Sequence, residues 1–169
     1  MSAKKSALLI YAGAALVLVC FFLPWISISF LGVSFSVSGL NIALGGGSSE
    51  LKELASSFGS NPLLYIVPAL AVVAAVVAYV GSKKMGSKNA GILEIILGIV
   101  PLVYGIYQLY RLNQEISKTA ESVAEFGIKM SIWNIMGIGF WGTALGFILI
   151  TLGGFLMMKE GNGQPTQMT

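Results

Sequence analysis

The side chains that could do chemistry in this 169-residue chain are few, and two of them, Glu94 and Gln108, lie in one apolar stretch. Glu94 is the only charged side chain inside a predicted membrane span. At the centre of a bilayer a carboxylate would cost about 2.5–3.5 kcal/mol on insertion scales. Glu94 lies about one turn inside Lys88 and Asn89, so we expect it near one interface, where the cost is lower. A structural or partner-binding role is favoured over proton or ion handling, because transport pathways usually contain several buried polar sites.

The composition excludes most catalytic and metal-binding sites. The chain has no histidine and no aspartate, which removes imidazole ligands, the Ser-His-Asp triad and most metal-binding arrangements. Cys20 is the single cysteine and cannot form an intrachain disulfide. No nucleophile, base and orienting group can be assembled, so we expect no enzyme, no catalytic residue, no metal and no cofactor.

Three tyrosines spaced by three residues, Tyr104, Tyr107 and Tyr110, are typical of an aromatic belt at a membrane interface. Contact with a quinone or a lipid is the alternative. Haem or chlorophyll is disfavoured because the chain lacks histidine ligands.

The chain reads as one integral membrane domain, because 56% of its residues are hydrophobic and only 10% are charged. We predict an α-helical four-helix transmembrane bundle with a small extracytoplasmic antiparallel β-sheet of about three strands and a short amphipathic helix. The predicted segments, in chain order, are a first span over 7–24, an outer loop over 25–61, a second span over 62–81, a cytoplasmic turn over 82–89, a third span with an outer extension over 90–126, an outer strand over 127–136, a fourth span over 137–158 and a cytoplasmic tail over 159–169.

Glycines recur at helical spacing on one face of the third span and on one face of the fourth. Small residues let transmembrane helices approach closely, so these faces predict helix packing, with homo-oligomerisation as the alternative use of the fourth-span face. The predicted packing glycines are Gly91, Gly98, Gly105, Gly139, Gly142, Gly146 and Gly153. On the third span, Glu94, Pro101 and Gln108 share the glycine stripe.

The outer loop opens with alternating apolar and serine residues in two runs separated by Leu31-Gly32, which predicts a hairpin with one apolar face. A re-entrant or interfacial apolar loop is the alternative. A lone hairpin is marginally stable, so a third strand is expected from the alternation that includes Met130. The residues assigned to the sheet are Trp25, Ile28, Phe30, Val33, Phe35, Val37 and Met130. The short amphipathic helix is predicted from Leu51 to Phe58.

Lysines predict the orientation of the chain. Lys4, Lys5, Lys83, Lys84, Lys88 and Lys159 fall on one side with only Glu160 against them, whereas the other side carries mixed charges. The positive-inside rule therefore places both termini in the cytoplasm of a cell-membrane protein. The net charge of +3 follows from this bias and does not indicate nucleic-acid binding.

The four spans, internal termini, outer hairpin and overshooting third helix resemble the claudin-like four-span (tetraspan) membrane protein superfamily. The local matches are Leu23-Pro24-Trp25 and Ser38-Gly39-Leu40. The chain lacks the second tryptophan and the loop cysteine pair of that superfamily, so it resembles a distant member. The resemblance implies an outer sheet, anchored in the membrane, that makes lateral or partner contacts.

The function predicted from these features is that of a non-catalytic structural, assembly or accessory subunit. Its expected partners are membrane lipids and other membrane subunits or further copies of itself. The alternative is a small transporter or channel element that uses Glu94 and Gln108.

Overall fold

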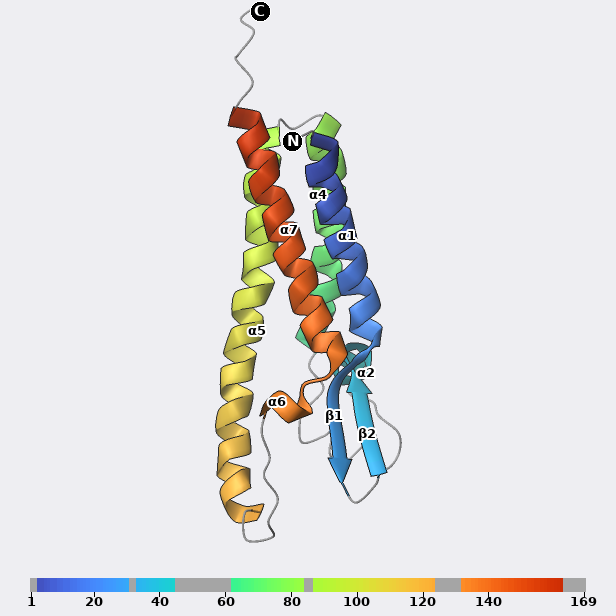
Figure 1. Cartoon of the computed structure of the whole chain (residues 1–169), viewed down its shortest axis with the longest axis vertical. Coiled ribbons are helices and arrows are strands. Elements are labelled where there is room, and N and C mark those ends of the chain that lie inside the picture. Colours follow the sequence, from blue (N-terminus) through green and yellow to red (C-terminus); the bar gives the residue numbers. More distant parts are fainter. Residues whose placement is uncertain (1–2, 31–32, 45–61, 84–86, 124–131, 163–169) are drawn as a thin grey trace, which may run out of the picture.

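Four long helices form the body of the protein. The computed structural model describes residues 3–30, 33–44, 62–83, 87–123 and 132–162. Helices α1 (Ala3–Phe22), α4 (Ile66–Lys83), α5 (Ser87–Val123) and α7 (Ile138–Asn162) are each long and apolar enough to span a membrane. They run side by side, and α1 begins at the same end of the bundle as α7 ends (Figure 1).

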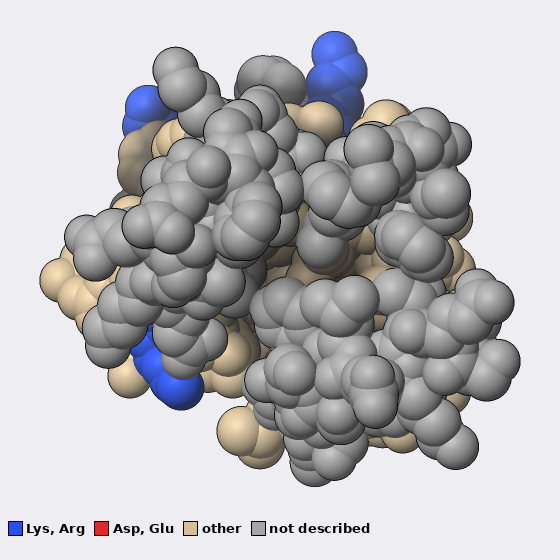
Figure 2. Space-filling view, turned by 90° about the horizontal axis from the view of Figure 1, so that it is seen from below, with Lys and Arg blue, Asp and Glu red and all other residues tan. Residues whose placement is uncertain are grey.

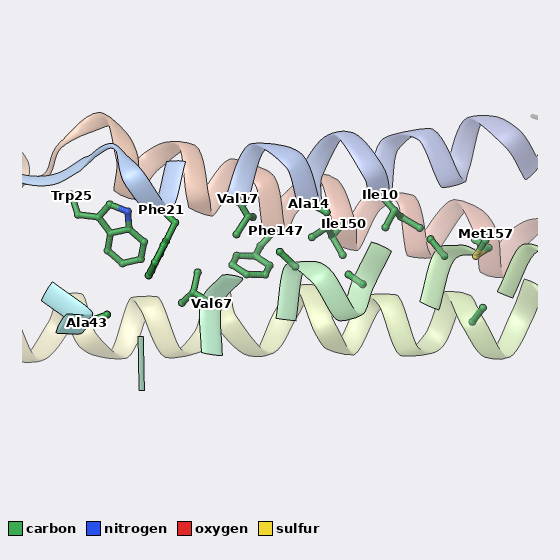
Figure 3. Close-up of a cluster of buried hydrophobic side chains, with 14 residues drawn as sticks. Ile10, Ala14, Val17, Phe21, Trp25, Ala43, Val67, Phe147, Ile150 and Met157 are labelled. Carbon is green, nitrogen blue, oxygen red and sulfur yellow. The ribbon is translucent and has the colours of Figure 1, made fainter. Parts of the chain in front are cut away.

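The helices are arranged as a ring in which α7 packs extensively on both α1 and α5, and α4 packs on the other side of each. The buried apolar side chains follow one another in a line along the bundle axis. Trp25 and Phe21 lie at one end, Val17, Phe147 and Ile10 follow, and Met157 lies at the other end (Figure 3). The core is therefore long and thin, as expected when each helix contributes one narrow stripe.

Small side chains face inward and large apolar side chains face outward on α4. Ala71, Ala74 and Ala78 are fully buried, whereas Val76 and Tyr79 are more than half exposed. Helices in lipid have no hydrophobic reason to bury large side chains, and they pack through small residues instead. The pattern on α4 is therefore the one expected for a membrane helix.

The contact between α1 and α7 is made by small residues spaced seven apart on both helices. On α1 these are Ser6, Gly13 and Cys20, and on α7 they are Gly139, Gly146 and Gly153. A Cβ atom at Gly146 would lie 2.6 Å from Val17 Cγ2 and 2.8 Å from the Gly13 carbonyl oxygen. A seven-residue repeat keeps the same face toward the partner, so the two backbones stay close along their length. We call this contact the α1–α7 seam.

Helix α5 packs on α7 over its first half only. A Cβ atom at Gly91 would lie 2.6 Å from the carbonyl oxygen of Gly154, and one at Gly98 would meet Thr151 and Phe147. Gly105 is the next glycine at the same spacing, but nothing lies within 4 Å of its Cβ position. Pro101 stands between Gly98 and Gly105, where it removes one helix hydrogen bond. Beyond it, α5 and α7 separate (Figure 1).

The hairpin consists of strands β1 (Pro24–Phe30) and β2 (Val33–Ser38), which pair antiparallel from Pro24 opposite Ser38 to Phe30 opposite Val33. The register includes Ile28 opposite Phe35 and Ile26 opposite Val37, with an irregularity between Pro24 and Ile26. The strand pattern ends at Ser38, whose hydroxyl accepts a hydrogen bond from the Asn41 amide. Serine in that position is a helix cap, and helix α2 (Gly39–Leu44) follows it.

The predicted third strand is wrong over the part that the structure describes. Ile132–Ile135 forms a short helix, α6, and only Met136 reaches the sheet, in a single bridge to Ile26. Trp133 within α6 stacks on Trp141 of α7, a contact that the alternating sequence pattern does not express. The described sheet therefore has two strands instead of about three. Met130 and the amphipathic helix predicted from Leu51 to Phe58 lie outside the described residues.

The helix bounds differ from the predicted spans mainly at the end where α1 begins. Helix α1 starts at Ala3 instead of residue 7, and α7 continues to Asn162, into the stretch predicted as a tail. The second span opens with a 3-10 turn, η1 (Pro62–Tyr65), before α4. Helix α5 runs unbroken from Ser87 to Val123 and extends well past the other three helices (Figure 1).

Replacing Gly146 with leucine is expected to destabilise the protein by about 1–3 kcal/mol or more, because the new side chain would meet Val17 and the backbone of α1. The measurement is the free energy of unfolding of the purified chain in detergent micelles or bicelles. Leu145→Val, at the neighbouring and half-exposed position, is the matched control and should change stability little. Equal stability of the Gly146 variant and the wild type would contradict the close approach of α1 and α7.

Candidate functional site

The most unusual side chain in the described part of the protein is Glu94, on the first half of α5. Its exposed fraction is 0%. Both carboxyl oxygens are buried, and neither has a hydrogen-bond partner among the described residues. Buried polar groups in native proteins are nearly always hydrogen-bonded, so an exception calls for a physical explanation.

Small residues from three helices surround Glu94. On α7, a Cβ atom at Gly154 would lie 2.7 Å from Glu94 Cβ. On α4, the carboxyl interacts with the backbone of Ala78, although the geometry does not reach that of a hydrogen bond. On α5 itself, Ala90 and Gly91 precede it by one turn and are buried. The carboxyl thus lies where three helices meet, in surroundings without a described polar partner.

A second acidic residue, Glu160, lies at the same end of the bundle and was assigned by the sequence analysis to the tail. One of its carboxyl oxygens accepts a hydrogen bond of 3.0 Å from the Ser6 hydroxyl on α1, and the other is buried without a described partner. The signal that could have identified it is the spacing on α7. Gly139, Gly146, Gly153 and Glu160 are each seven residues apart, so Glu160 continues the face that packs on α1.

Gln108 lies on the second half of α5, beyond Pro101. Its side-chain amide donates a hydrogen bond of 3.2 Å to the hydroxyl of Tyr104, one turn earlier on the same helix. Glu94 is 14 residues away, which corresponds to about 21 Å along an α-helix. The structure therefore does not bring the two predicted polar residues into one site. Tyr107 and Tyr110 are more than half exposed on the same half of α5.

The seven predicted packing glycines divide into three groups. Gly91 and Gly98 lie against α7, and Gly139, Gly142, Gly146 and Gly153 lie against the end of α1 or along it. Gly105 lies against nothing in the described chain. The first two groups are occupied by contacts within this chain, so they leave no groove for a second molecule.

Trp25 joins the opposite end of the bundle to the hairpin. Its exposed fraction is 8%, and its indole N–H donates a hydrogen bond of 3.0 Å to the carbonyl oxygen of Cys20, in the last turn of α1. Its ring packs edge-on against Phe21 and Phe140. A Cβ atom at Gly39 would lie 2.8 Å from the ring, so only glycine lets α2 approach it this closely.

Aromatic contacts continue from Trp25 to the surface. Phe140 packs edge-on against Trp141, which stacks on Trp133 with ring centroids 5.6 Å apart. Trp133 is 68% exposed and Trp141 is 42% exposed. Exposed tryptophans are typical of a membrane interface.

The predicted sheet residues fall at several places. Trp25 is buried, Val37 is half-buried, and the backbones of Ile28, Phe30, Val33 and Phe35 pair in the hairpin. Seen from the hairpin end, the described residues are mostly uncharged, with Lys or Arg side chains at the margin (Figure 2). Among the described residues, no group of three histidine, cysteine, aspartate or glutamate side chains could hold a metal ion.

Comparison with models of known protein families, with curated proteins and with solved structures found no match to this chain.

Glu94 and Glu160 lie near the end of the bundle at which α1 begins, and removing their carboxyl groups should change the unfolding free energy in opposite directions. Glu94→Met is expected to stabilise the protein by about 1–3 kcal/mol, because an apolar side chain of similar length replaces a buried carboxyl without a described partner. Glu160→Met is expected to destabilise it by about 1 kcal/mol, because the buried Ser6 hydroxyl loses its acceptor. Unfolding free energies in micelles measure both effects. A loss of stability in the Glu94 variant would show that its carboxyl makes a stabilising contact.

Trp25→Phe is expected to lower the unfolding free energy by about 1–3 kcal/mol, because it removes the hydrogen bond to Cys20 and leaves unfilled volume. The matched control is Trp141→Phe, a tryptophan that is partly exposed, for which we expect less than about 1 kcal/mol. Thermal unfolding of both variants in the same detergent distinguishes them. The reverse order would mean that Trp25 does not fix the hairpin end.

Proposed function

We propose that this chain is a non-catalytic, multi-pass cell-membrane protein that acts as a structural, assembly or accessory subunit. Both termini lie in the cytoplasm in this proposal, and the hairpin lies outside. Four helices of sufficient length and hydropathy support the membrane location. The inward alanines and outward valines of α4 support it as well, since this order suits lipid as the solvent.

The observation that carries the proposal is the open space in front of Gly105 on α5. Gly91 and Gly98 contact α7, but Gly105, on the same face, contacts nothing in the described chain. Beside it, Ile106 is more than half exposed. A glycine face in an apolar helix lets a second helix approach closely. Among the described residues, the face of α5 at Gly105 thus has room for a partner helix.

The partner in this proposal is a membrane helix, either from another subunit or from a second copy of the chain. The outer β-sheet surface contributes further contacts outside the membrane. A distant relation to the claudin-like four-span superfamily is part of the proposal. The two segments that carry the resemblance meet where Gly39 lies against Trp25.

A small transporter or channel element is the second proposed function. Its support is the full burial of Glu94 without a described hydrogen-bond partner, which is unusual for a purely structural residue. Its weakness is the wide separation of Glu94 from Gln108 along α5. The subunit role therefore agrees better with the geometry.

The test is association of the full chain in native nanodiscs, measured by native mass spectrometry with and without the membrane extract of its host. Gly105→Trp should abolish the assembly, because the indole would fill the open space in front of α5. The matched control is Val103→Trp, two residues away and on nearly the opposite face, which should leave it intact. Wild-type chain that remains a monomer in both preparations would contradict the subunit role.

A further inference from the structure

Helix packing alone does not require a carboxyl side chain at position 94. An alanine or glycine would suit the contact with Gly154 and Ala78, as small residues do elsewhere in the bundle. Instead, the chain buries a carboxyl completely and offers it no described partner. A buried carboxyl in a membrane span is costly and marks a functional site by default. The remaining question is what it binds.

We propose that Glu94 is a proton-binding site, reached from the end of the bundle at which α1 begins and α7 ends. A proton is the ligand that a single carboxyl can hold without further ligands. A metal cation needs several oxygen ligands, and the described residues bring no group of three acidic, cysteine or histidine side chains together. Both Glu94 oxygens are available, because neither is taken by a described hydrogen bond.

Other ionisable groups also lie near this end of the bundle. They are Lys4 and Lys5 on α1, Tyr79 and Lys83 on α4, Lys88 on α5, and Lys159 and Glu160 on α7. The Nζ atom of Lys159 lies 5.7 Å from the centre of the Phe155 ring. Lys88 is exposed, and Glu160 accepts a hydrogen bond from the Ser6 hydroxyl. These placements leave Glu94 as the carboxyl of the three-helix junction.

The stretch of α5 between its start and Glu94 is short and packs on α4 and α7 through small residues. Glu94 is seven residues from the start of α5, or about 10 Å along the helix. Over this distance α5 contributes Ala90 and Gly91, and Gly81 of α4 lies against Ala90. At the end itself, Ser6 and Glu160 supply polar oxygens. In this proposal a proton reaches the junction from this end, past Ala90 and Gly91 of α5.

Proton binding does not require transport, and it does not involve the second half of α5. The inference is therefore independent of the partner surface around Gly105, and a failure of one leaves the other standing. It also assigns to Glu94 a role that the subunit proposal does not give it.

The test is labelling of the full chain in nanodiscs with dicyclohexylcarbodiimide, an apolar reagent that reacts with a protonated carboxyl. The acid proton passes to a carbodiimide nitrogen and the carboxyl oxygen bonds to the central carbon, and the adduct then rearranges to a stable acylurea with nothing released. Peptide mass spectrometry should find the adduct on Glu94. Its rate should fall about tenfold for each pH unit above the midpoint of the titration.

Two variants and one added ion control the experiment. Glu94→Gln should lose the adduct, and Glu160→Gln should keep it. Suppression of labelling by sodium or potassium at constant pH would overturn the choice of a proton as ligand. Labelling that does not change with pH would overturn reversible binding.

A second measurement covers a carboxyl that the reagent cannot reach for steric reasons. Infrared difference spectra between low and high pH should contain the carbonyl band of a protonated carboxylic acid, and Glu94→Gln should remove it while Glu160→Gln leaves it. Absence of both the adduct and the Glu94-dependent band would overturn the proposal.

Discussion

The close approach of α1 and α7 is the constraint on which the rest of the structure depends. Ser6, Gly13 and Cys20 face Gly139, Gly146 and Gly153, and side chains larger than these would push the two backbones apart. In lipid, helices gain little from burying large apolar groups, so tight contact of this kind supplies the packing. Once α1 and α7 are fixed, α4 and α5 close the ring by packing on them.

The same contact determines where the chain leaves the bundle. Gly139 lies against the Cys20 carbonyl at the end of α1, and that carbonyl accepts the indole hydrogen of Trp25. The amide of Gly137 donates to the carbonyl of Trp25, which ties the start of α7 to the start of β1. The hairpin is therefore held by the first and last helices together, although they are distant in sequence.

Much of this fold could be predicted from the sequence, because the signals are periodic. The four spans follow from apolar length, the hairpin from alternation, and the seams from glycines spaced by three, four or seven residues. The misses have local or tertiary causes. Trp133 of α6 stacks on Trp141 of α7, a contact that alternation cannot express, and Ser38 caps helix α2, which was not predicted. Glu160 was missed because a charged residue near the end of a span resembles the start of a tail.

Helix α5 combines two kinds of environment that the sequence presents as one stripe. Before Pro101, Gly91 and Gly98 pack on α7 and hold Glu94 at the junction of three helices. After Pro101, nothing in the described chain lies within 4 Å of the Gly105 Cβ position, and Gln108 bonds to Tyr104 of its own helix. Spacing records which residues share a face, and it cannot record whether another helix covers that face. The proline that separates the halves therefore also separates the two proposed roles: proton binding within the bundle and contact with a partner beyond it.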